Sequence, residues 1–178
     1  MRGSFIETPP RTIMEVYKSL PEGTLAELID NIIYMSPSPI YKHQFILQTI
    51  FRKLSSEIVD KGKGEIIIAP FDVYLDEVGN AVQPDIVVIL EGTKGLDKEG
   101  HFHGIPDLLI EILSEGNKSH DLIKKKELYE RFGVKEYWVV DPETKKTEGF
   151  QLQKGRYVSI SDQIGKMDSP LLAVTLSF

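Results

Sequence analysis

The run "GIPDLLIEILSEGNKS", residues 104–119, constrains the fold more than any other part of the chain. Successive side chains of a strand point to opposite faces, so the leucines and isoleucines of 108–113 would make both faces apolar. The pattern is therefore typical of a buried strand. Glu111 interrupts it. An ionised carboxylate there is unfavourable by several kcal/mol unless a lysine, a metal ion or a backbone amide meets it.

The length and composition predict one globular domain over residues 1–178. Apolar residues make up 41% of the 178 residues and charged residues 27%, which argues against disorder. The formal charge of −6 does not suggest a protein that coats nucleic acid by bulk attraction. A local basic patch or a bound divalent cation would still allow a nucleic-acid enzyme.

The chain has no cysteine, which excludes disulfides, thiolate zinc sites and cysteine nucleophiles. This fits a reducing compartment. The first 20 residues lack the apolar core of a signal peptide, and no stretch approaches the roughly 20 apolar residues of a membrane helix. We therefore expect a soluble cytoplasmic protein.

In the first half of the chain, residues 8–23 predict a short helix bounded by prolines, and 24–39 an extended segment that turns at Asp30-Asn31. Residues 40–62 predict the clearest helix, ended by Gly62. Its apolar residues fall at helical spacing: Phe45, Ile46, Ile50, Leu54 and Ile58.

Two strand-like runs follow, 65–75 and 81–90, and the turn residues between them predict a hairpin. The polar, Gly-rich segment 91–104 predicts a mobile loop, and 105–114 the buried strand.

In the second half, residues 119–133 predict a helix capped by Ser119 and ended by Gly133. A strand over 135–142 and a closing hairpin around Lys154-Gly155 complete the pattern. The simplest interpretation of this pattern is a single α/β domain.

Two acidic residues open strands directly after prolines, Asp85 and Asp107. Asp107 and Glu111 share a strand face but lie about 13 Å apart along it, too far to grip one ion. Asp85, on the preceding strand, lies beside Glu111 if the two strands pair. Carboxylates from neighbouring strands, together with waters, form a credible Mg²⁺ or Mn²⁺ site.

A lysine from the next helix is the expected positive partner. Asp121, Lys125 and Tyr129 are four residues apart and share one helical face. A helix that directly follows the strand of Glu111 can fold back over it. We therefore choose Lys125 over the neighbouring Lys124 and Lys126.

These residues resemble a known family. Asp85 in "QPDIVV", Glu111 in "IEILS" and the helical D-x-x-x-K-x-x-x-Y followed by "FGVKEYWVVDP" are similar to the Uma family of putative restriction endonucleases, within the PD-(D/E)xK nuclease superfamily. The similarity covers roughly residues 22–145. Leu113 stands where that superfamily has its lysine, so the resemblance implies that the lysine has moved to the helix as Lys125. Asn31 stands where the family has glycine, and asparagine tolerates a left-handed backbone.

The resemblance implies a restriction-endonuclease-like mixed central sheet flanked by helices, and metal-assisted hydrolysis of phosphodiesters. Asp85 and Glu111 would hold Mg²⁺ or Mn²⁺ with the main-chain carbonyl of Ile112. The metal ion would polarise the phosphoryl oxygen and lower the pKa of an attacking water. Lys125 would orient that water or neutralise developing charge. Glu27 would bind the metal through water or accept from Lys125. DNA is the expected substrate, and a homodimer suits a two-stranded substrate.

Structural roles compete with these assignments. Asp107 fits a strand-edge residue, and Asp121 fits equally a first-turn acid favoured by the helix dipole.

His43 also matches the family, although its pattern alone favours a semi-exposed histidine. His101 and His103 have no third ligand nearby in the sequence, which makes a metal pair weak. Lys124 and Lys126 would lie on a solvated helix face or contact phosphates. Tyr129 and Trp138 would pack in the core or at an interface.

Two other function classes stay open. One is an inactive nuclease-fold module that binds nucleic acid or protein. The other is a self-associating scaffold, in which the apolar run 169–178 completes an interface. The three groups Asp85, Glu111 and Lys125 together favour the enzyme. The sequence contains no Walker-type phosphate loop, no Gly-x-Ser-x-Gly motif and no cysteine. These absences argue against an NTPase, a serine hydrolase and a thiol enzyme.

Overall fold

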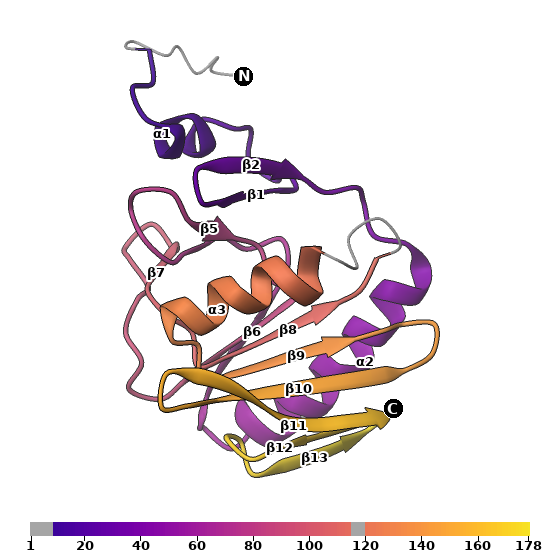
Figure 1. The fold of residues 1–178 in the computed structure, drawn as a ribbon. Helices are drawn as coiled ribbons and strands as arrows, with labels where there is room; N and C mark the ends of the chain where they lie inside the picture. The colour runs from indigo at the N-terminus through magenta and orange to yellow at the C-terminus, as the bar shows by residue number, and fades with distance from the viewer. Residues whose placement is uncertain (1–8, 115–119) are drawn as a thin grey trace.

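A mixed six-stranded sheet forms the centre of the molecule in the computed structural model (Figure 1). The structure describes residues 9–114 and 120–178, without the side chains of 120–122. The expected cap Ser119 and the side chain of Asp121 therefore lie outside the described residues. In spatial order the strands are β11 (Arg156–Ile164), β10 (Lys146–Gln153), β9 (Glu136–Val140), β8 (Leu108–Ile112), β6 (Ile86–Leu90) and β3 (Gly64–Ile68). Only the β8–β9 pair is parallel among these neighbours.

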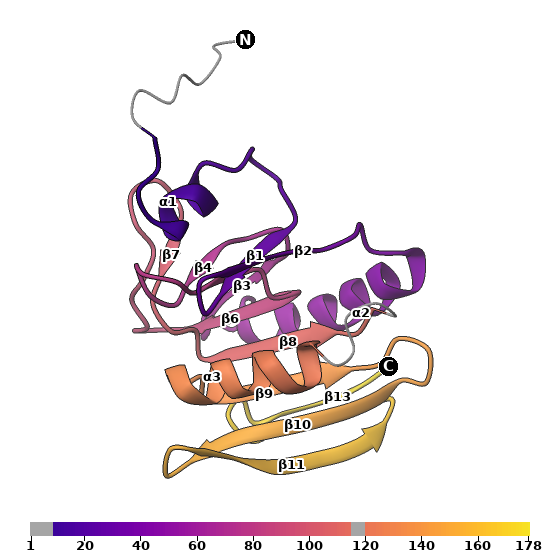
Figure 2. The ribbon, with the colours of Figure 1, turned by 45° about the horizontal axis from the view of Figure 1, so that its top comes forward.

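Strand β8 is buried on both faces, as the sequence predicts. Ile110 and Ile112 point to a core shared with helix α2 (Tyr41–Ile58), whereas Leu109 points to a core shared with helix α3 (Lys126–Phe132). Figure 2 shows the two helices on opposite sides of the sheet. This arrangement confirms the expected α/β class with a mixed central sheet flanked by helices.

A second sheet packs next to the first. Its order is β2 (Ile32–Met35), β1 (Ala26–Ile29), β5 (Ala81–Val82), β4 (Val73–Tyr74) and β7 (Phe102–His103). The predicted turn between β1 and β2 is present, with left-handed backbone at Asp30 (φ 48°) and Asn31 (φ 64°). The predicted N-terminal helix is α1 (Ile13–Lys18), and Thr12 and Glu15 form a capping box at its start.

The hairpin predicted from runs 65–75 and 81–90 is divided between the two sheets. β3 pairs with β6 in the central sheet, while β4 pairs with β5 in the smaller sheet. Extending the β3–β6 register places Pro70 opposite Pro84. Neither proline has an N–H to donate, so the ladder breaks there and the chain crosses between sheets.

Helix α2 has the predicted position but a narrower buried face. Ile46, Ile50, Leu54 and Ile58 are buried, whereas Phe45 is 51% exposed. Phe45 has the helical spacing of the other four residues but lies outside this core, because the central sheet covers only the stripe that contains the four aliphatic residues.

The segment before β8 contains more structure than the predicted loop. β7 pairs in parallel with β4, and Phe102 at its start is fully buried. The Gly-rich composition therefore reflects tight turns around a buried aromatic ring.

The predicted helix 119–133 is divided. Residues His120–Lys125 form a π-helix, η1, which continues into α3 and ends at Gly133 with φ 87°. The predicted stop at Gly133 is therefore confirmed, whereas a uniform α-helix is not.

The C-terminal region closes the fold. β10 and β11 form the predicted hairpin, with left-handed backbone at Lys154 and Gly155. The run 169–178 lies in a second hairpin, β12 (Lys166–Ser169) with β13 (Val174–Ser177). Leu172, Val174 and Leu176 are buried against α2. These side chains are part of the core, which removes the feature that suggested a self-associating scaffold.

Among the described helices, none combines the length and the apolar character that a bilayer crossing requires.

Candidate active site

A pocket of about 480 Å³ opens where β1, β8, the start of α2 and the end of η1 meet. It brings together every residue that the sequence assigned to catalysis or metal binding: Glu27, Asp85, Glu111, Ile112 and Lys125. His43 lines the pocket too. The residues come from separate elements, so only the folded chain brings them together.

Glu111 contacts a lysine and a tyrosine. Its Oε1 lies 3.0 Å from Lys125 Nζ and accepts a hydrogen bond of 2.7 Å from the hydroxyl of Tyr129. Burial raises the pKa of Tyr129 well above its usual range, and the adjacent Glu111 carboxylate adds to this. Tyr129 therefore stays a proton donor toward Glu111. The sequence favoured a core or an interface position for Tyr129, and the structure places the ring in the core. The sequence did not reveal this hydrogen bond.

Lys125 bridges two carboxylates. Its Nζ lies 3.0 Å from Oε1 of Glu27 as well as from Glu111, and all three side chains are at most 6% exposed. Removing one member of such a buried set leaves an uncompensated charge. The choice of Lys125 among the three consecutive lysines agrees with this geometry, because Lys125 and Tyr129 share the helix face that covers Glu111.

Asp85 lies next to Glu111 because β6 and β8 pair. The register joins Ile86 to Ile110, so the preceding residue of β6 comes beside the following residue of β8. Oδ2 of Asp85 accepts a 2.7 Å hydrogen bond from the backbone N–H of Ile112. The same oxygen lies 3.2 Å from Nε2 of His43.

His43 is buried, contrary to the semi-exposed position that its helical pattern favoured. It lies on the first turn of α2, which the central sheet and the segment after β2 enclose. Its contact with Asp85 explains the burial of a polar ring on this helix.

Glu27 reaches the pocket from β1. Its Oε1 accepts a 2.9 Å hydrogen bond from the backbone N–H of Gln83. This bond ties the smaller sheet to the segment that leads into Asp85. No local sequence pattern shows this approach, and only the family resemblance indicated Glu27.

Asp107 has a structural role, judged from its contacts with the residues that the structure describes. It lies outside the pocket lining and accepts hydrogen bonds from the Leu90 backbone, Thr93 and Lys135. This agrees with its expected position at a strand edge. Burial acts to raise the pKa of Asp107, but Lys135 and the other donors outweigh it and lower the pKa.

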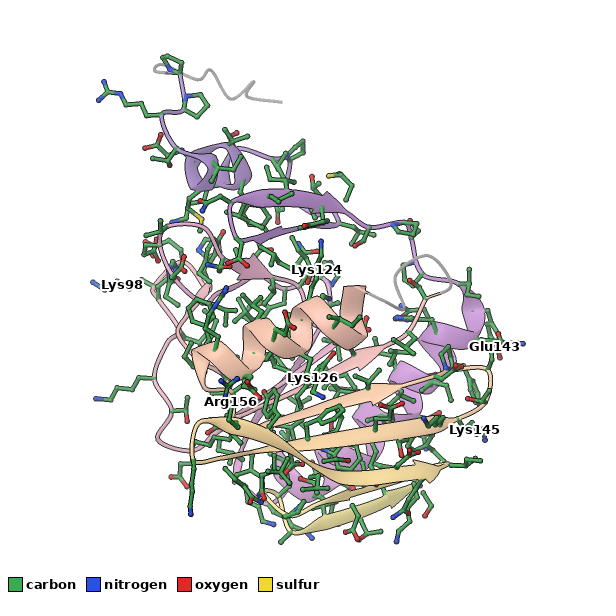
Figure 3. The ribbon with its side chains drawn as sticks, in the orientation of Figure 1. Lys98, Lys124, Lys126, Glu143, Lys145 and Arg156 are labelled. Carbon is green, nitrogen blue, oxygen red and sulfur yellow. The ribbon has the colours of Figure 1, made fainter. Side chains whose placement is uncertain are left out.

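The neighbouring lysines contact aromatic rings instead of the pocket. Nζ of Lys124 lies 4.7 Å from the ring centroid of Tyr34 and donates to its hydroxyl, whereas Nζ of Lys126 lies 3.8 Å from the centroid of Phe150. Lys124 therefore lies toward β2 and Lys126 toward β10 (Figure 3).

The described pocket lining carries five acidic residues and one lysine. Asp141 and Glu143 complete the acidic set, and Lys42 pairs with Glu143 from outside the lining. A phosphodiester is an anion, and this excess of negative charge would repel it. Carboxylate oxygens are also the donors that Mg²⁺ and Mn²⁺ prefer, so the residues fit a divalent cation.

Comparisons with known proteins agree with this geometry at the level of family and fold. A family model described as "Uma2: Putative restriction endonuclease" matches residues 14–176. A solved structure of a putative nuclease belonging to DUF820, from Anabaena variabilis ATCC 29413, is 20% identical and covers 94% of this chain and 95% of its own, with a TM-score of 0.76. At that identity the likeness shows the fold. No curated protein matches the chain.

Proposed function

The chain belongs to the Uma2 family, whose description supports a nuclease, and on this premise we propose that it is a divalent-metal-dependent endonuclease acting on DNA. One observation carries the proposal. Asp85 and Glu111 project into one pocket from neighbouring strands, with Lys125 held beside Glu111. This is the set of groups that metal-assisted phosphodiester hydrolysis requires.

Asp85 and Glu111 would hold Mg²⁺ or Mn²⁺, with the main-chain carbonyl of Ile112 as a third oxygen. When bound, the ion supplies Lewis acidity and lowers the pKa of a water molecule. The backbone N–H of Ile112 and the ring of His43 hold the Asp85 carboxylate in place. The hydroxyl of Tyr129 does the same for Glu111.

Lys125 is the group that would act on the water and the phosphate. Its ammonium lines the pocket and is fixed between Glu27 and Glu111, so its positive charge is in place without reorganisation. A fixed donor of this kind orients the attacking water or neutralises charge developing on the phosphate. Glu27 positions Lys125 through their ion pair.

The start of α2 supports a nucleic-acid substrate. Ile40 at its N-cap makes no side-chain capping hydrogen bond, and it lines the pocket with His43 and Gln44. Helix N-termini favour phosphate groups. Next to them, the exposed rings of Tyr41 and Phe45 stack on each other at 6.1 Å, and exposed aromatic rings are the surfaces on which bases stack.

Calorimetric titration with Mn²⁺ is the first test. We expect wild type to bind Mn²⁺ at the pocket, and both Asp85→Asn and Glu111→Gln to lose one equivalent of binding. Asp162→Asn, which neutralises an exposed carboxylate outside the pocket lining, is the matched control and should bind as wild type. Absence of binding in wild type, or full binding in both pocket variants, would overturn the metal site.

Cleavage of supercoiled DNA and of RNA in Mg²⁺ is the second test. We expect DNA cleavage that a chelator abolishes and that Lys125→Met loses, while Lys126→Met retains it. Metal binding without cleavage of either polymer would favour the inactive nuclease-fold module. Preferential cleavage of RNA would replace the proposed substrate.

The homodimer stays a prediction, because the structure describes one chain. Cutting both strands of a duplex in one binding event takes two pockets, so we expect sedimentation to show a dimer in the presence of duplex DNA. A monomeric complex would limit the enzyme to one strand per binding event.

A further inference from the structure

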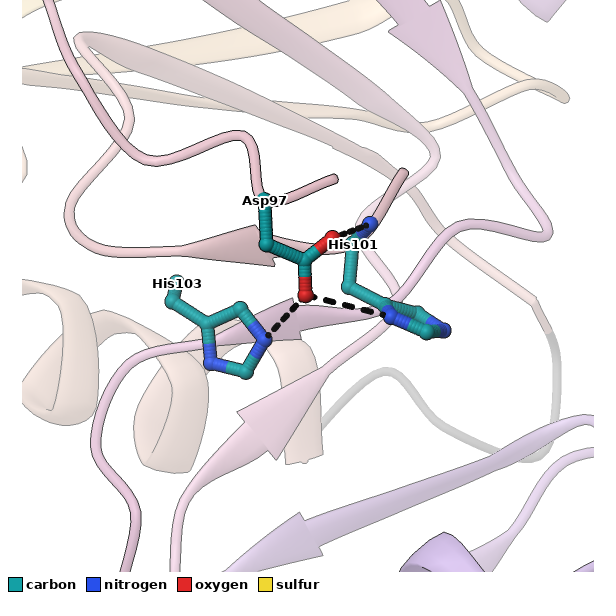
Figure 4. Close-up of side chains that lie close together, drawn as sticks. All are labelled: Asp97, His101 and His103. Atoms are coloured by element: carbon teal, nitrogen blue, oxygen red, sulfur yellow. Dashed lines mark hydrogen bonds and ion pairs between the residues drawn. The ribbon is translucent and has the colours of Figure 1, made fainter. Parts of the chain in front are cut away.

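A second group of metal-binding side chains lies on the segment around β7. Asp97, His101 and His103 place one ligand atom each within 4.8 Å of one another. Figure 4 shows the Asp97 carboxylate between the two imidazole rings. None of the three belongs to the described lining of the pocket. The expectation that the two histidines have no third ligand nearby is therefore wrong, and the missing ligand is four residues before His101.

The spacing of these atoms is close to that of a tetrahedral site. Zn²⁺ ligands at 2.0–2.1 Å from the ion lie roughly 3.3 Å from one another in tetrahedral geometry. Oδ2 of Asp97 lies 3.1 Å from Nε2 of His103 and 3.4 Å from Nδ1 of His101. The His101 side chain is 52% exposed, so a small ring rotation can bring the two nitrogens to the same spacing.

The orientation of His103 is already determined by its neighbours. Its Nδ1 lies 2.5 Å from Oε1 of Glu77, which leaves Nε2 directed at Asp97. Its ring stacks on Tyr74 with centroids 4.7 Å apart and planes at 11°. Metal-binding histidines commonly donate their other N–H to a carboxylate, which selects the tautomer and raises the basicity of the ligand nitrogen.

Asp97 is held as an ionised ligand. Its Oδ1 accepts a 2.8 Å hydrogen bond from the backbone N–H of His101. Desolvation acts to raise the pKa of Asp97, but this amide and the His101 ring outweigh it and lower the pKa. Oδ2 consequently faces both imidazoles as a carboxylate oxygen.

We propose that Asp97, His101 and His103 bind a Zn²⁺ ion, with Glu77 orienting the His103 ring. The ligand atoms are Oδ2 of Asp97, Nδ1 of His101 and Nε2 of His103. Imidazole ligands suit Zn²⁺ and disfavour Mg²⁺, so the site differs in chemistry from the three oxygen ligands proposed for the pocket. The ion would tie the turn 97–101 to β7, and through Glu77 to the turn between β4 and β5.

Zn²⁺ titration in excess Mg²⁺, which competes for the oxygen-lined pocket, tests the site. We expect one Zn²⁺ per wild-type chain and loss of that binding in His101→Ala and in His103→Ala. Glu77→Gln should weaken binding by roughly 10–100-fold, as removal of a carboxylate behind a metal-bound histidine does. Glu99→Gln is the matched control, because it removes an exposed carboxylate of the same turn, and it should bind as wild type.

Histidine C–H resonances of the wild type give an independent readout that needs no variant. Zn²⁺ should shift the signals of His101 and His103, and a chelator should reverse the shifts. Equal Zn²⁺ affinity in wild type and His103→Ala, or unchanged histidine signals at saturating Zn²⁺, would overturn the proposal. Neither result depends on whether the pocket binds Mn²⁺ or cleaves DNA.

Discussion

Lys125 Nζ lies 3.0 Å from Oε1 of Glu111, so the buried carboxylate of the central strand faces a buried ammonium from the following helix. Leu113, two residues after Glu111 and directly after the end of β8, packs in the apolar core beside the pocket. The ammonium that pairs with Glu111 therefore comes from η1 and not from β8 itself.

Lys125→Met tests whether this charge balances the pocket. The substitution leaves the Glu27 and Glu111 carboxylates buried without their cation, so we expect the free energy of unfolding to fall by about 3–5 kcal/mol. Chemical denaturation measures it. Added Mn²⁺ should restore part of the loss, because a bound cation replaces the missing charge. Lys126→Met should lose far less, and equal losses in both variants would contradict the assignment.

Tyr129→Phe removes the hydroxyl that donates to Glu111 and leaves a packed ring. We expect a loss of about 1–3 kcal/mol in the free energy of unfolding, because a buried acceptor loses its donor. Thermal or denaturant unfolding provides the measurement. Tyr41→Phe, at a position 79% exposed, serves as the control. No difference between the two variants would show that the Tyr129 bond does not hold Glu111.

Tyr41→Ala and Phe45→Ala test the proposed stacking surface. Each should weaken single-stranded DNA binding by about 1–3 kcal/mol, the usual contribution of one stacked base, without lowering stability. Fluorescence anisotropy in the presence of a chelator, which we expect to abolish cleavage, measures binding without cleavage. Val78→Ala removes an exposed apolar side chain elsewhere and should leave binding unchanged. Unaltered affinity in both aromatic variants would place the nucleic acid on another surface.

The free energy of unfolding should depend on Asp107 as the pH is lowered into the acidic range. Its pKa is lowered in the folded state, so its contribution is fully present above the unfolded-state pKa of about 3.9. That contribution is lost as the pH falls through the lower folded-state value. Asp107→Asn should be less stable than wild type at neutral pH and lose less stability on acidification. The same dependence of the free energy of unfolding on pH in wild type and Asp107→Asn would refute this prediction. Asp162→Asn, at an exposed carboxylate, is the control and should behave as wild type.

Local patterns determined most of the elements and part of the pocket. The run with apolar side chains on both faces predicted β8, and the four-residue spacing of Lys125 and Tyr129 indicated the helix face that contacts Glu111. The adjacent strands also brought Asp85 to Glu111. These features depend on residues near one another in the chain or on neighbouring strands, where side-chain periodicity is decisive.

Tertiary structure alone decided the remaining contacts. Glu27 reaches Lys125 from another sheet, and His43 turns inward to Asp85. The crossing of the chain between the sheets at Pro70 and Pro84 brings the β1 sheet to the pocket. Periodicity describes which face a side chain takes within one element. The distance between elements depends on how two sheets and two helices pack, and that packing is a property of the whole chain.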